Sequence, residues 1–360
     1  MYILGTDEAG YGPNLGPLVI SVSAWNAKQN VSGAEMYSAL YPVVLQASHK
    51  KELRNCPGSF LLDDSKKLYH GRRQDGLKYL EFALLTALKS LNKINSNATI
   101  ADVYKALCEK SIKAQFDSNQ NSLERNASNQ KNAWQGSLFD SDVSCTPSER
   151  SGCDIPPWEI PSTASVPLDA NKEQLEETVR AFERIQNDSQ IRLADLRSDA
   201  VFPWRFNQQC TYWGNKSTLL SKTTLNLLES VLINCSDESE IWCDKHGGRD
   251  FYAPLLEEQF HSDIEIIEES RGISSYCFQW NGFPRRIHFQ AKGDCAPAGA
   301  LASIACKYLR ELFMNQLNDF WSARVPGLEP TAGYPVDAKR FLEQIQPALN
   351  FPLNVLWRNR

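Results

Sequence analysis

Two adjacent carboxylates, Asp7 and Glu8, follow a short apolar run near the start of the chain, and glycines at positions 10 and 12 come directly after them. Neighbouring carboxylates repel each other, and a divalent cation that binds both is the simplest reason to place them together. Glycines let the backbone approach a ligand closely. A polar turn would explain the same residues without a ligand, so this stretch alone leaves both interpretations open.

Two later stretches share this pattern of an apolar strand that ends in a carboxylate beside glycine. They contain Asp244, followed by Gly247 and Gly248, and Asp294, preceded by Gly293. Strand ends can converge on one edge of a sheet. Four carboxylates without histidine or cysteine partners favour Mg²⁺ or Mn²⁺ over zinc. Two such ions roughly 4 Å apart are the standard device for in-line phosphodiester displacement. Acids at strand ends are also common where no metal binds, so the pattern indicates a metal site without proving it.

Both strands and helices are expected to position these residues. Residues 1–25 are typical of paired strands, with the second over 15–22, and Asn281-Gly282 predicts a hairpin between strands around 276–280 and 287–289. Apolar spacing predicts helices over 77–91, 172–196, 218–233 and from Pro297, and Asp337 is expected to cap a last helix that Pro347 ends. This mixture predicts an α/β or α+β fold whose sheet is built from both ends of the chain.

The segment from about 114 to 168 differs in composition from the rest. It is rich in Asn, Gln and Ser, then in proline, and shows no apolar period, so we expect a linker-like or poorly ordered insertion. With the charged helix that follows, this predicts an insertion of unknown role over 114–200, between 1–113 and 201–360. We expect a short Gly/Ser linker in place of 117–168 to leave a folded, active protein.

Composition excludes several classes of protein. The 360 residues are 42% hydrophobic, enough for a sizeable core. No long apolar run predicts a membrane span, and no signal peptide is expected. The ten cysteines are scattered without a Cys-x-x-Cys pair, which disfavours zinc ribbons and is typical of reduced thiols in a cytoplasmic protein.

The net charge of −5 does not by itself exclude a nucleic-acid partner. Residues 117–200 hold 15 acids against 8 bases, so the excess of acid belongs to that segment and the remainder is slightly basic. Local clusters of charge set the field at a site more than the total does.

Four motifs of the chain resemble, in the same order, motifs of the ribonuclease HII family. They are Gly5–Pro13 with Gly16–Val19, Asp64–Leu68, Lys292–Asp294 followed by Ala302–Lys307 and Arg310, and Gly333–Pro335. The resemblance covers residues 1–92 and 200–345, with gaps. Four motifs in order are far more specific than any one of them.

This resemblance implies a ribonuclease H-like fold, with a mixed sheet flanked by helices and a catalytic domain made of 1–113 and 201–360. It implies hydrolysis of the RNA strand of RNA–DNA hybrids, or cleavage at single ribonucleotides embedded in duplex DNA. It also implies that Asp7, Glu8, Asp244 and Asp294 hold catalytic Mg²⁺ or Mn²⁺. We expect the protein to act on nucleic acid as a monomer, away from membranes.

The same resemblance implies a set of substrate-binding residues. The Gly10-Tyr11-Gly12 turn would read the ribose 2′-hydroxyl, which separates RNA from DNA, and Tyr334 would stack on the sugar of the following nucleotide. Ser65, Lys66 and Lys67 would hold phosphates, which positions a duplex without reading its sequence, and Lys307 would also contact the substrate. Taken alone, Lys66 and Lys67 are more simply explained as a solvated basic face.

The chain also departs from the family. Tyr11 stands where the family usually has arginine, which removes a cation from the phosphate side. Asp244 is the weakest match, because Asp-Lys-His-Gly-Gly replaces the usual Asp-Gly-Asn and Asp250 competes for its role. His246 is either a site residue or an ordinary turn histidine.

Two other functions fit parts of this pattern. One is a nucleic-acid-binding protein of the same fold with degraded catalysis, against which the presence of all four carboxylates argues. The other is a nuclease of DNA junctions, against which the Gly-Tyr turn argues. Cleavage assays on hybrid, single-ribonucleotide, all-DNA and junction substrates separate the three.

Overall fold

The computed structural model describes residues 1–28, 31–69, 71, 76–108, 155–291 and 296–359. Its strands are β1 Tyr2–Ala9, β2 Leu18–Asn26, β3 Val44–Leu45, β4 Phe60–Leu61, β5 Arg192–Val201, β6 Ser239–Cys243, β7 Glu265–Glu269, β8 Ile273–Trp280 and β9 Phe283–Gln290. Its α-helices are α1 Gly33–Leu40, α2 Ser65–Leu68, α3 Lys78–Ser90, α5 Lys172–Ser189, α6 Pro203–Trp213, α7 Lys216–Leu232, α8 Ala253–Phe260, α9 Pro297–Ser322 and α10 Pro335–Ile345. Residues 100–108 are also helical.

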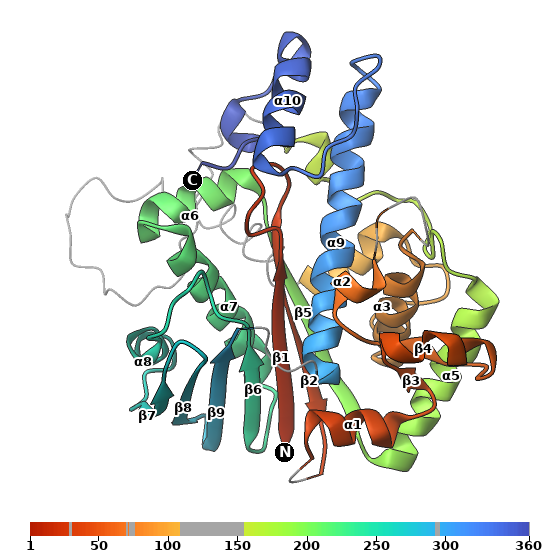
Figure 1. The fold of residues 1–360 in the computed structure, drawn as a ribbon, viewed down its shortest axis with the longest axis vertical. Helices are drawn as coiled ribbons and strands as arrows, with labels where there is room; N and C mark the ends of the chain where they lie inside the picture. Colours follow the sequence, from red (N-terminus) through yellow and green to blue (C-terminus); the bar gives the residue numbers. More distant parts are fainter. Residues whose placement is uncertain (29–30, 70, 72–75, 109–154, 292–295, 360) are drawn as a thin grey trace, which may run out of the picture.

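A seven-stranded mixed sheet organises these elements, in the order β5-β2-β1-β6-β9-β8-β7. The three central strands β1, β6 and β9 are parallel, and their neighbours pair antiparallel on both sides. The carboxyl ends of the central strands therefore lie at one edge of the sheet, which is the upper edge in Figure 1. The mixed sheet flanked by helices that the sequence predicts is confirmed.

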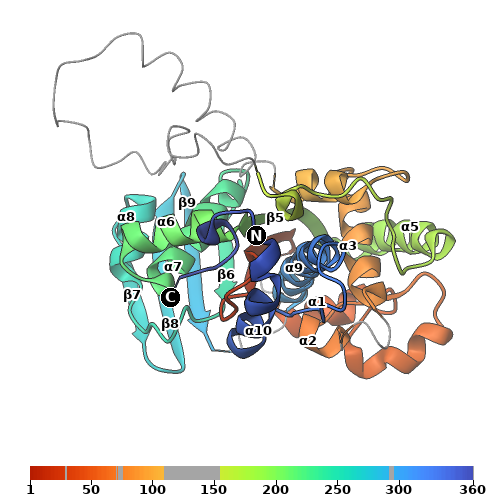
Figure 2. The same ribbon diagram turned by 90° about the horizontal axis from the view of Figure 1, so that it is seen from above.

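Helices cover both faces of the sheet because alternate side chains along each strand point to opposite faces. Ile3 packs in a core with α3 and α9, whereas Leu4 packs in a second core with α7 and α8. Seen from above in Figure 2, α6, α7 and α8 lie on one side and α3, α5 and α9 on the other. The long helix α9 packs closely along β1 and β2.

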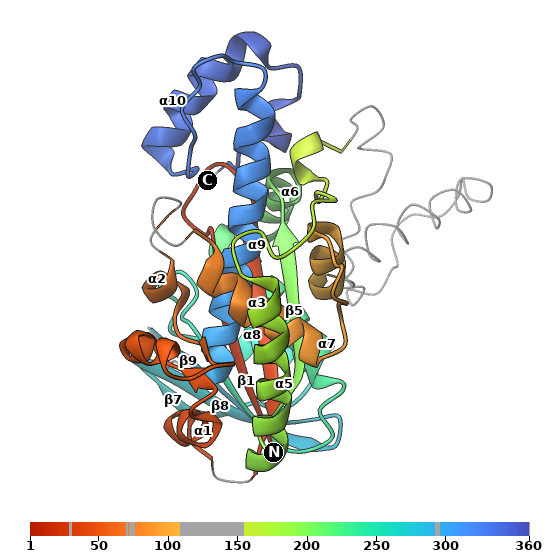
Figure 3. The same cartoon turned by 90° about the vertical axis from the view of Figure 1, so that its right-hand side faces the viewer.

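A third, smaller core lies beyond the end of the sheet. Trp158, Trp321, Phe341 and Leu356 are buried in it, so it joins the last turns of α9 to α10 and to the C-terminal segment. Figure 3 shows α10 beside this end of α9. This arrangement places the N-terminus of α10 near the carboxyl edge of the sheet.

Several predicted elements are confirmed. The helix expected over 218–233 is α7, and the helix expected from Pro297 is α9. The hairpin forms as predicted, with Trp280 paired to Phe283 and positive φ angles of 52° at Asn281 and 80° at Gly282. The second strand begins three residues later than expected, at Leu18, because Leu15 pairs with Trp357 near the C-terminus.

Two predicted elements were wrong. The helix expected over 172–196 ends at Ser189, and residues 192–201 form the edge strand β5 of the main sheet. Charged residues at alternate positions of β5 obscure its strand pattern: Asp195 is paired with Lys93. Asp337 does not cap the last helix, since Tyr334 is the N-cap residue.

Part of the predicted insertion packs on the core. The backbone amides of Leu168, Asp169 and Ala170 donate to the buried carboxylate of Glu81 at 2.7, 2.6 and 2.9 Å, and the Tyr308 hydroxyl donates to it at 2.8 Å. The expectation of a linker-like or poorly ordered segment over about 114–168 is therefore wrong for the part around Trp158 and Val166, which are buried. Residues 109–154 lie outside the described ranges. The division into a catalytic domain and an insertion over 114–200 stays a prediction.

Within the described ranges, no helix is long and apolar enough to cross a membrane.

Trp158→Ala should lower the free energy of unfolding by about 3–5 kcal/mol, because it leaves a cavity in an aromatic cluster. The centroid of the Trp158 ring lies 4.9 Å from that of the Phe351 ring and 5.0 Å from that of the Phe320 ring. Ile155→Ala is the matched control, since Ile155 is 50% exposed, and should change stability by less than about 0.5 kcal/mol. Urea unfolding measures both variants; equal stabilities would show that this segment does not support the fold.

Candidate active site

Asp7 and Asp244 meet because β1 and β6 are parallel neighbours. Gly5 of β1 pairs with Trp242 of β6. Asp7 and Asp244 each follow two residues after these paired positions, so they point to the same face of the sheet as Gly5 and Trp242 do. The charge of Asp244 acts on both Asp7 and Glu8, as expected for side chains that share one sheet edge. Asp7, Glu8 and Asp244 therefore lie at one edge of the sheet, near enough for their charges to interact. Asp294 lies outside the described residues, in the segment between β9 and α9.

Gly5 is the position at which α9 touches the sheet. A side-chain carbon built at Gly5 would lie 2.2 Å from the backbone nitrogen of Gly299, a distance that no real carbon occupies. On the neighbouring strand, the Ser23 hydroxyl donates to the carbonyl of Ala298 at 2.7 Å. The first turn of α9 therefore rests directly on β1, which places Ser303 beside Asp7.

Ser303 connects Asp7 to the short helix α2. Its hydroxyl donates to the Ser65 hydroxyl at 2.9 Å and accepts from the Ser65 backbone amide at 3.2 Å. Ser303 also lowers the pKa of the Asp7 carboxyl as a neighbouring hydrogen-bonding group. Asp64 caps α2 by accepting from the Lys66 amide at 2.9 Å. These contacts hold Lys66 close to the carboxylates, and its positive charge acts on Glu8.

Both carboxyls of β1 bind protons more tightly than usual. Burial, with smaller contributions from the charges of Asp244 and Asp64, raises the pKa of Asp7 to about 6, although hydrogen bonding by Ser303 and the Glu8 amide opposes the shift. Burial and then the Asp7 charge raise the pKa of Glu8 to about 8, with Lys66 opposing. Clusters of carboxyls with raised pKa values are typical of functional sites.

The donor chemistry of Asp7, Glu8 and Asp244 suits a hard cation, because all three offer oxygen ligands and their mutual repulsion would fall on binding one. Within the part of the chain that the structure describes, however, no three Asp, Glu, His or Cys side chains are grouped closely enough to hold a metal ion. A complete site would thus need a rearrangement of these side chains or a ligand from outside the described residues, where Asp294 lies.

Asp250 is occupied elsewhere. Its carboxylate accepts from Lys245 Nζ at 2.6 Å, and its backbone carbonyl accepts from the Ser274 hydroxyl at 2.6 Å. His246 is buried, its Nδ1 lies 3.1 Å from the Ser221 hydroxyl, and burial lowers its pKa to about 3. His246 is therefore a neutral histidine of the loop core. Geometry favours Asp244 over Asp250 as the partner of Asp7.

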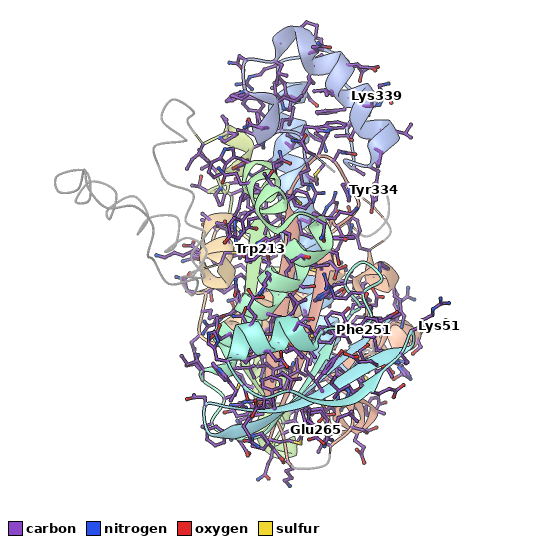
Figure 4. All side chains as sticks on the ribbon, turned by 90° about the vertical axis from the view of Figure 1, so that its left-hand side faces the viewer. Lys51, Trp213, Phe251, Glu265, Tyr334 and Lys339 are labelled. Carbon is purple, nitrogen blue, oxygen red and sulfur yellow. The ribbon has the colours of Figure 1, made fainter. Side chains whose placement is uncertain are left out.

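The predicted turn at Gly10-Tyr11-Gly12 lies beside the predicted aromatic residue, Tyr334. Gly10 has a φ of 89°, and a side chain there would meet the Arg310 guanidinium. A side-chain carbon at Gly12 would lie 3.9 Å from the Tyr334 ring. Tyr334 is 56% exposed, and Figure 4 shows it above the level of Phe251 on the same side of the molecule. The turn and an accessible aromatic ring thus adjoin the carboxylates.

The C-terminal segment fixes this turn. Arg358 is buried and donates to the carbonyls of Gly10, at 2.7 Å, and Pro13. The Asn14 amide donates to the Gly333 carbonyl at 2.8 Å. Sequence reasoning missed Arg358, which carries no local signal of its role.

The other predicted substrate-binding residues differ in how accessible they are. Ser65 is buried behind Asp7, and Lys67 is paired with Asp63 at 2.8 Å. Lys307 is paired with Glu311 at 2.6 Å and lies 4.7 Å from the Tyr69 ring centroid. Of these lysines, Lys66 is the one placed next to the carboxylates. The roles of all four residues stay predictions.

The fold and the site together define an α/β protein with a carboxylate cluster at the carboxyl ends of two adjacent parallel strands. A scan against protein-family models and a search of curated proteins give no match. Among solved structures, a chain of the PCNA:RNase HII complex from Archaeoglobus fulgidus matches with a TM-score of 0.39 and 12% identity, covering 100% of this chain and 95% of that chain. Ribonuclease H2 from Pyrococcus horikoshii OT3 matches with a TM-score of 0.37 and 14% identity, covering 99% and 92%.

Asp7→Asn should stabilise the cation-free protein at high pH. The carboxyls of Asp7 and Glu8 have ordinary pKa values of 3.8 and 4.5 and folded-state values of about 6 and about 8. Between these values the folded state keeps protons that the unfolded chain has released, so their contribution to the free energy of unfolding falls as the pH rises. At pH 8 in EDTA we expect Asp7→Asn to exceed wild type by about 1–3 kcal/mol, with no difference near pH 3.

Urea unfolding across this pH range measures the difference. Asp250→Asn is the control and should be less stable than wild type at pH 8, because it removes the partner of Lys245. Added Mg²⁺ or Mn²⁺ should stabilise wild type more than Asp7→Asn if the cluster binds the ion. A difference between Asp7→Asn and wild type that does not change with pH would contradict this account.

Proposed function

We propose that this protein is a metal-dependent endoribonuclease that hydrolyses the RNA strand of RNA–DNA hybrids or cuts at single ribonucleotides embedded in duplex DNA. The observation that carries the proposal is the convergence of Asp7, Glu8 and Asp244 beside a glycine turn and the exposed ring of Tyr334. Carboxylates that bind protons this tightly at one sheet edge suit a cation site, and a turn with an aromatic neighbour suits recognition of a sugar.

In this proposal Asp7, Glu8, Asp244 and Asp294 would hold Mg²⁺ or Mn²⁺. When bound, such ions supply the charge stabilisation and the activated water that in-line phosphodiester displacement requires. Ser303, next to Asp7, would favour the ionised form of this carboxyl, because it lowers the pKa of Asp7. Lys66 adds positive charge at the rim of the cluster, where a phosphate next to the scissile one would lie.

Recognition of ribose would come from the turn and from Tyr334. Backbone groups of Gly10 and Gly12 can approach a 2′-hydroxyl because neither residue carries a side chain. Tyr334 would pack against the sugar of the next nucleotide. A deoxyribose packs there better than a ribose, whose hydroxyl would be desolvated without a partner. The enzyme would then prefer an RNA-to-DNA step, cut on the 5′ side of the last ribonucleotide and leave a 3′-hydroxyl and a 5′-phosphate.

Purified protein should cleave a labelled hybrid and a duplex with one ribonucleotide in Mg²⁺ or Mn²⁺, and nothing in EDTA. All-DNA duplex and a DNA junction should stay intact. Asp244→Asn should reduce cleavage by more than about a hundred-fold, whereas Asp250→Asn, tested at a temperature where it is folded, should retain activity. Cleavage of all-DNA duplex at a similar rate would remove the ribonuclease assignment, and binding without cleavage would favour a nucleic-acid-binding protein.

Tyr334→Ala should lower cleavage at a single embedded ribonucleotide more than cleavage of a long hybrid, because only the single-ribonucleotide substrate makes every cut depend on the junction. Val336→Ala is the matched control and should affect neither substrate, since Val336 lies two residues away in the first turn of α10 and is 89% exposed. Steady-state kcat/KM on the two substrates gives the ratio. An equal loss on both would remove the junction-reading role of Tyr334.

A further inference from the structure

We propose that Tyr11, Lys216 and Arg249 form a binding site for a backbone phosphate of the nucleic-acid strand, beside the carboxylate cluster. The residues come from three elements: the glycine turn after β1, the start of α7 and the loop between β6 and α8. We call this set, with Ser217, Thr218 and Gly247 around it, the Tyr11 site. The class of ligand rests on the proposed function, whereas the site itself rests on the contacts below.

Lys216 is a half-buried cation in the first turn of α7. Its Nζ lies 4.7 Å from the centroid of the Tyr11 ring. Among the residues that the structure describes, no carboxylate comes within ion-pair distance of it. Contact with an aromatic face compensates an ammonium group only in part. An anion at this place would complete its environment.

Arg249 has hydrogen-bond donors that the described residues do not use. One terminal nitrogen donates to the Thr218 hydroxyl at 3.1 Å, while the buried Nε has no hydrogen-bond partner. No acidic group of the described ranges forms an ion pair with Arg249 either. A guanidinium carries five N–H donors in a planar fork that fits two oxygens of a phosphate. A partly used guanidinium next to an unpaired ammonium is an arrangement suited to an anion.

Close packing brings these two cations to Tyr11. Gly247 has a φ of 60°, and a side-chain carbon there would lie 2.6 Å from the Tyr11 hydroxyl oxygen and 3.1 Å from the Ser217 hydroxyl oxygen. The Ser217 hydroxyl also donates to the His246 carbonyl at 2.9 Å, which ties the loop to α7. The loop, the helix and the turn therefore meet at one point.

The Tyr11 site adjoins the carboxylates but differs from them in charge. Burial and then the negative charge of Glu8 raise the pKa of Tyr11, while Arg249 lowers it. Tyr11 thus interacts with an acidic group, Glu8, and with both cations. A strand whose scissile phosphate is at the carboxylates would place a neighbouring phosphate within reach of Lys216 and Arg249. The turn carries tyrosine rather than a cation at position 11, and these two residues supply positive charge there from other elements.

Duplex binding at several salt concentrations tests the Tyr11 site. In an Asp7→Asn background, which should bind without cutting, the dissociation constant of a labelled RNA–DNA hybrid is measured from 50 to 200 mM salt. Lys216→Ala and Arg249→Ala should each weaken binding several-fold and each reduce the slope of log K against log salt by about one, the effect of losing one phosphate contact. Lys216→Arg should keep the wild-type slope.

Arg180→Ala is the matched control. Arg180 is exposed on α5, and its replacement removes the same charge as Arg249→Ala but should leave the slope unchanged. In the cutting-competent protein, Lys216→Ala and Arg249→Ala should raise KM for the hybrid while kcat changes little. Thermal unfolding of each variant confirms that it is folded before binding is interpreted.

Unchanged slopes in folded Lys216→Ala and Arg249→Ala would overturn the proposal. Inorganic phosphate provides a second arm: stabilisation of wild type but not of the double variant, with duplex binding unaffected, would show a site for free phosphate and also overturn it. If wild type binds the hybrid but cuts no substrate, while both variants reduce the slope of log K against log salt, the proposed function fails and the proposal of a phosphate site at Tyr11 is retained.

Discussion

The close contact between α9 and β1 at Gly5 is the constraint on which the rest of the site depends. No side chain fits between the two backbones there, so the helix begins in direct contact with the strand that carries Asp7 and Glu8. That contact brings Ser303 to Asp7 and, through Ser65, fixes the position of α2. The contact thereby fixes β1, α9 and α2 relative to one another around the carboxylates, with Ser303 joining them.

Charge is distributed around this frame in two zones. Asp7, Glu8 and Asp244 concentrate negative charge where burial already disfavours ionisation, and such a site is costly to the fold until a cation or protons occupy it. Lys66 adds positive charge beside Glu8, and Lys216 and Arg249 add it at Tyr11 from two other elements. A phosphodiester strand, which needs metal at one phosphate and cations at its neighbours, matches this division.

The turn between the two zones is held by the far end of the chain. Arg358 donates to the carbonyl of Gly10, and the segment before Tyr334 bonds to Asn14. The third core, with Trp158 and Trp321, supports both segments. The C-terminal residues and the segment after 155 therefore contribute to the site by positioning, although neither supplies a group to the carboxylate cluster.

The sequence by itself determined the features that local pattern encodes. Asp7 and Glu8 beside glycines, the Asn281-Gly282 hairpin, and the helices α7 and α9 follow from residue types within one strand, turn or helical period. The prediction from sequence was wrong at β5, where ion-paired side chains replace apolar ones. It was also wrong at the cap of α10, where Asp337 accepts hydrogen bonds from Thr331 and Arg340 instead.

Only the tertiary structure decided which distant residues meet. The parallel register of β1 and β6 favours Asp244 over Asp250, and the packing of α7 against the loop after β6 places Lys216 and Arg249 at Tyr11. Sequence separation hides such contacts, because strand pairing and close packing act between residues hundreds of positions apart, whereas the signals in a single sequence extend over a few turns.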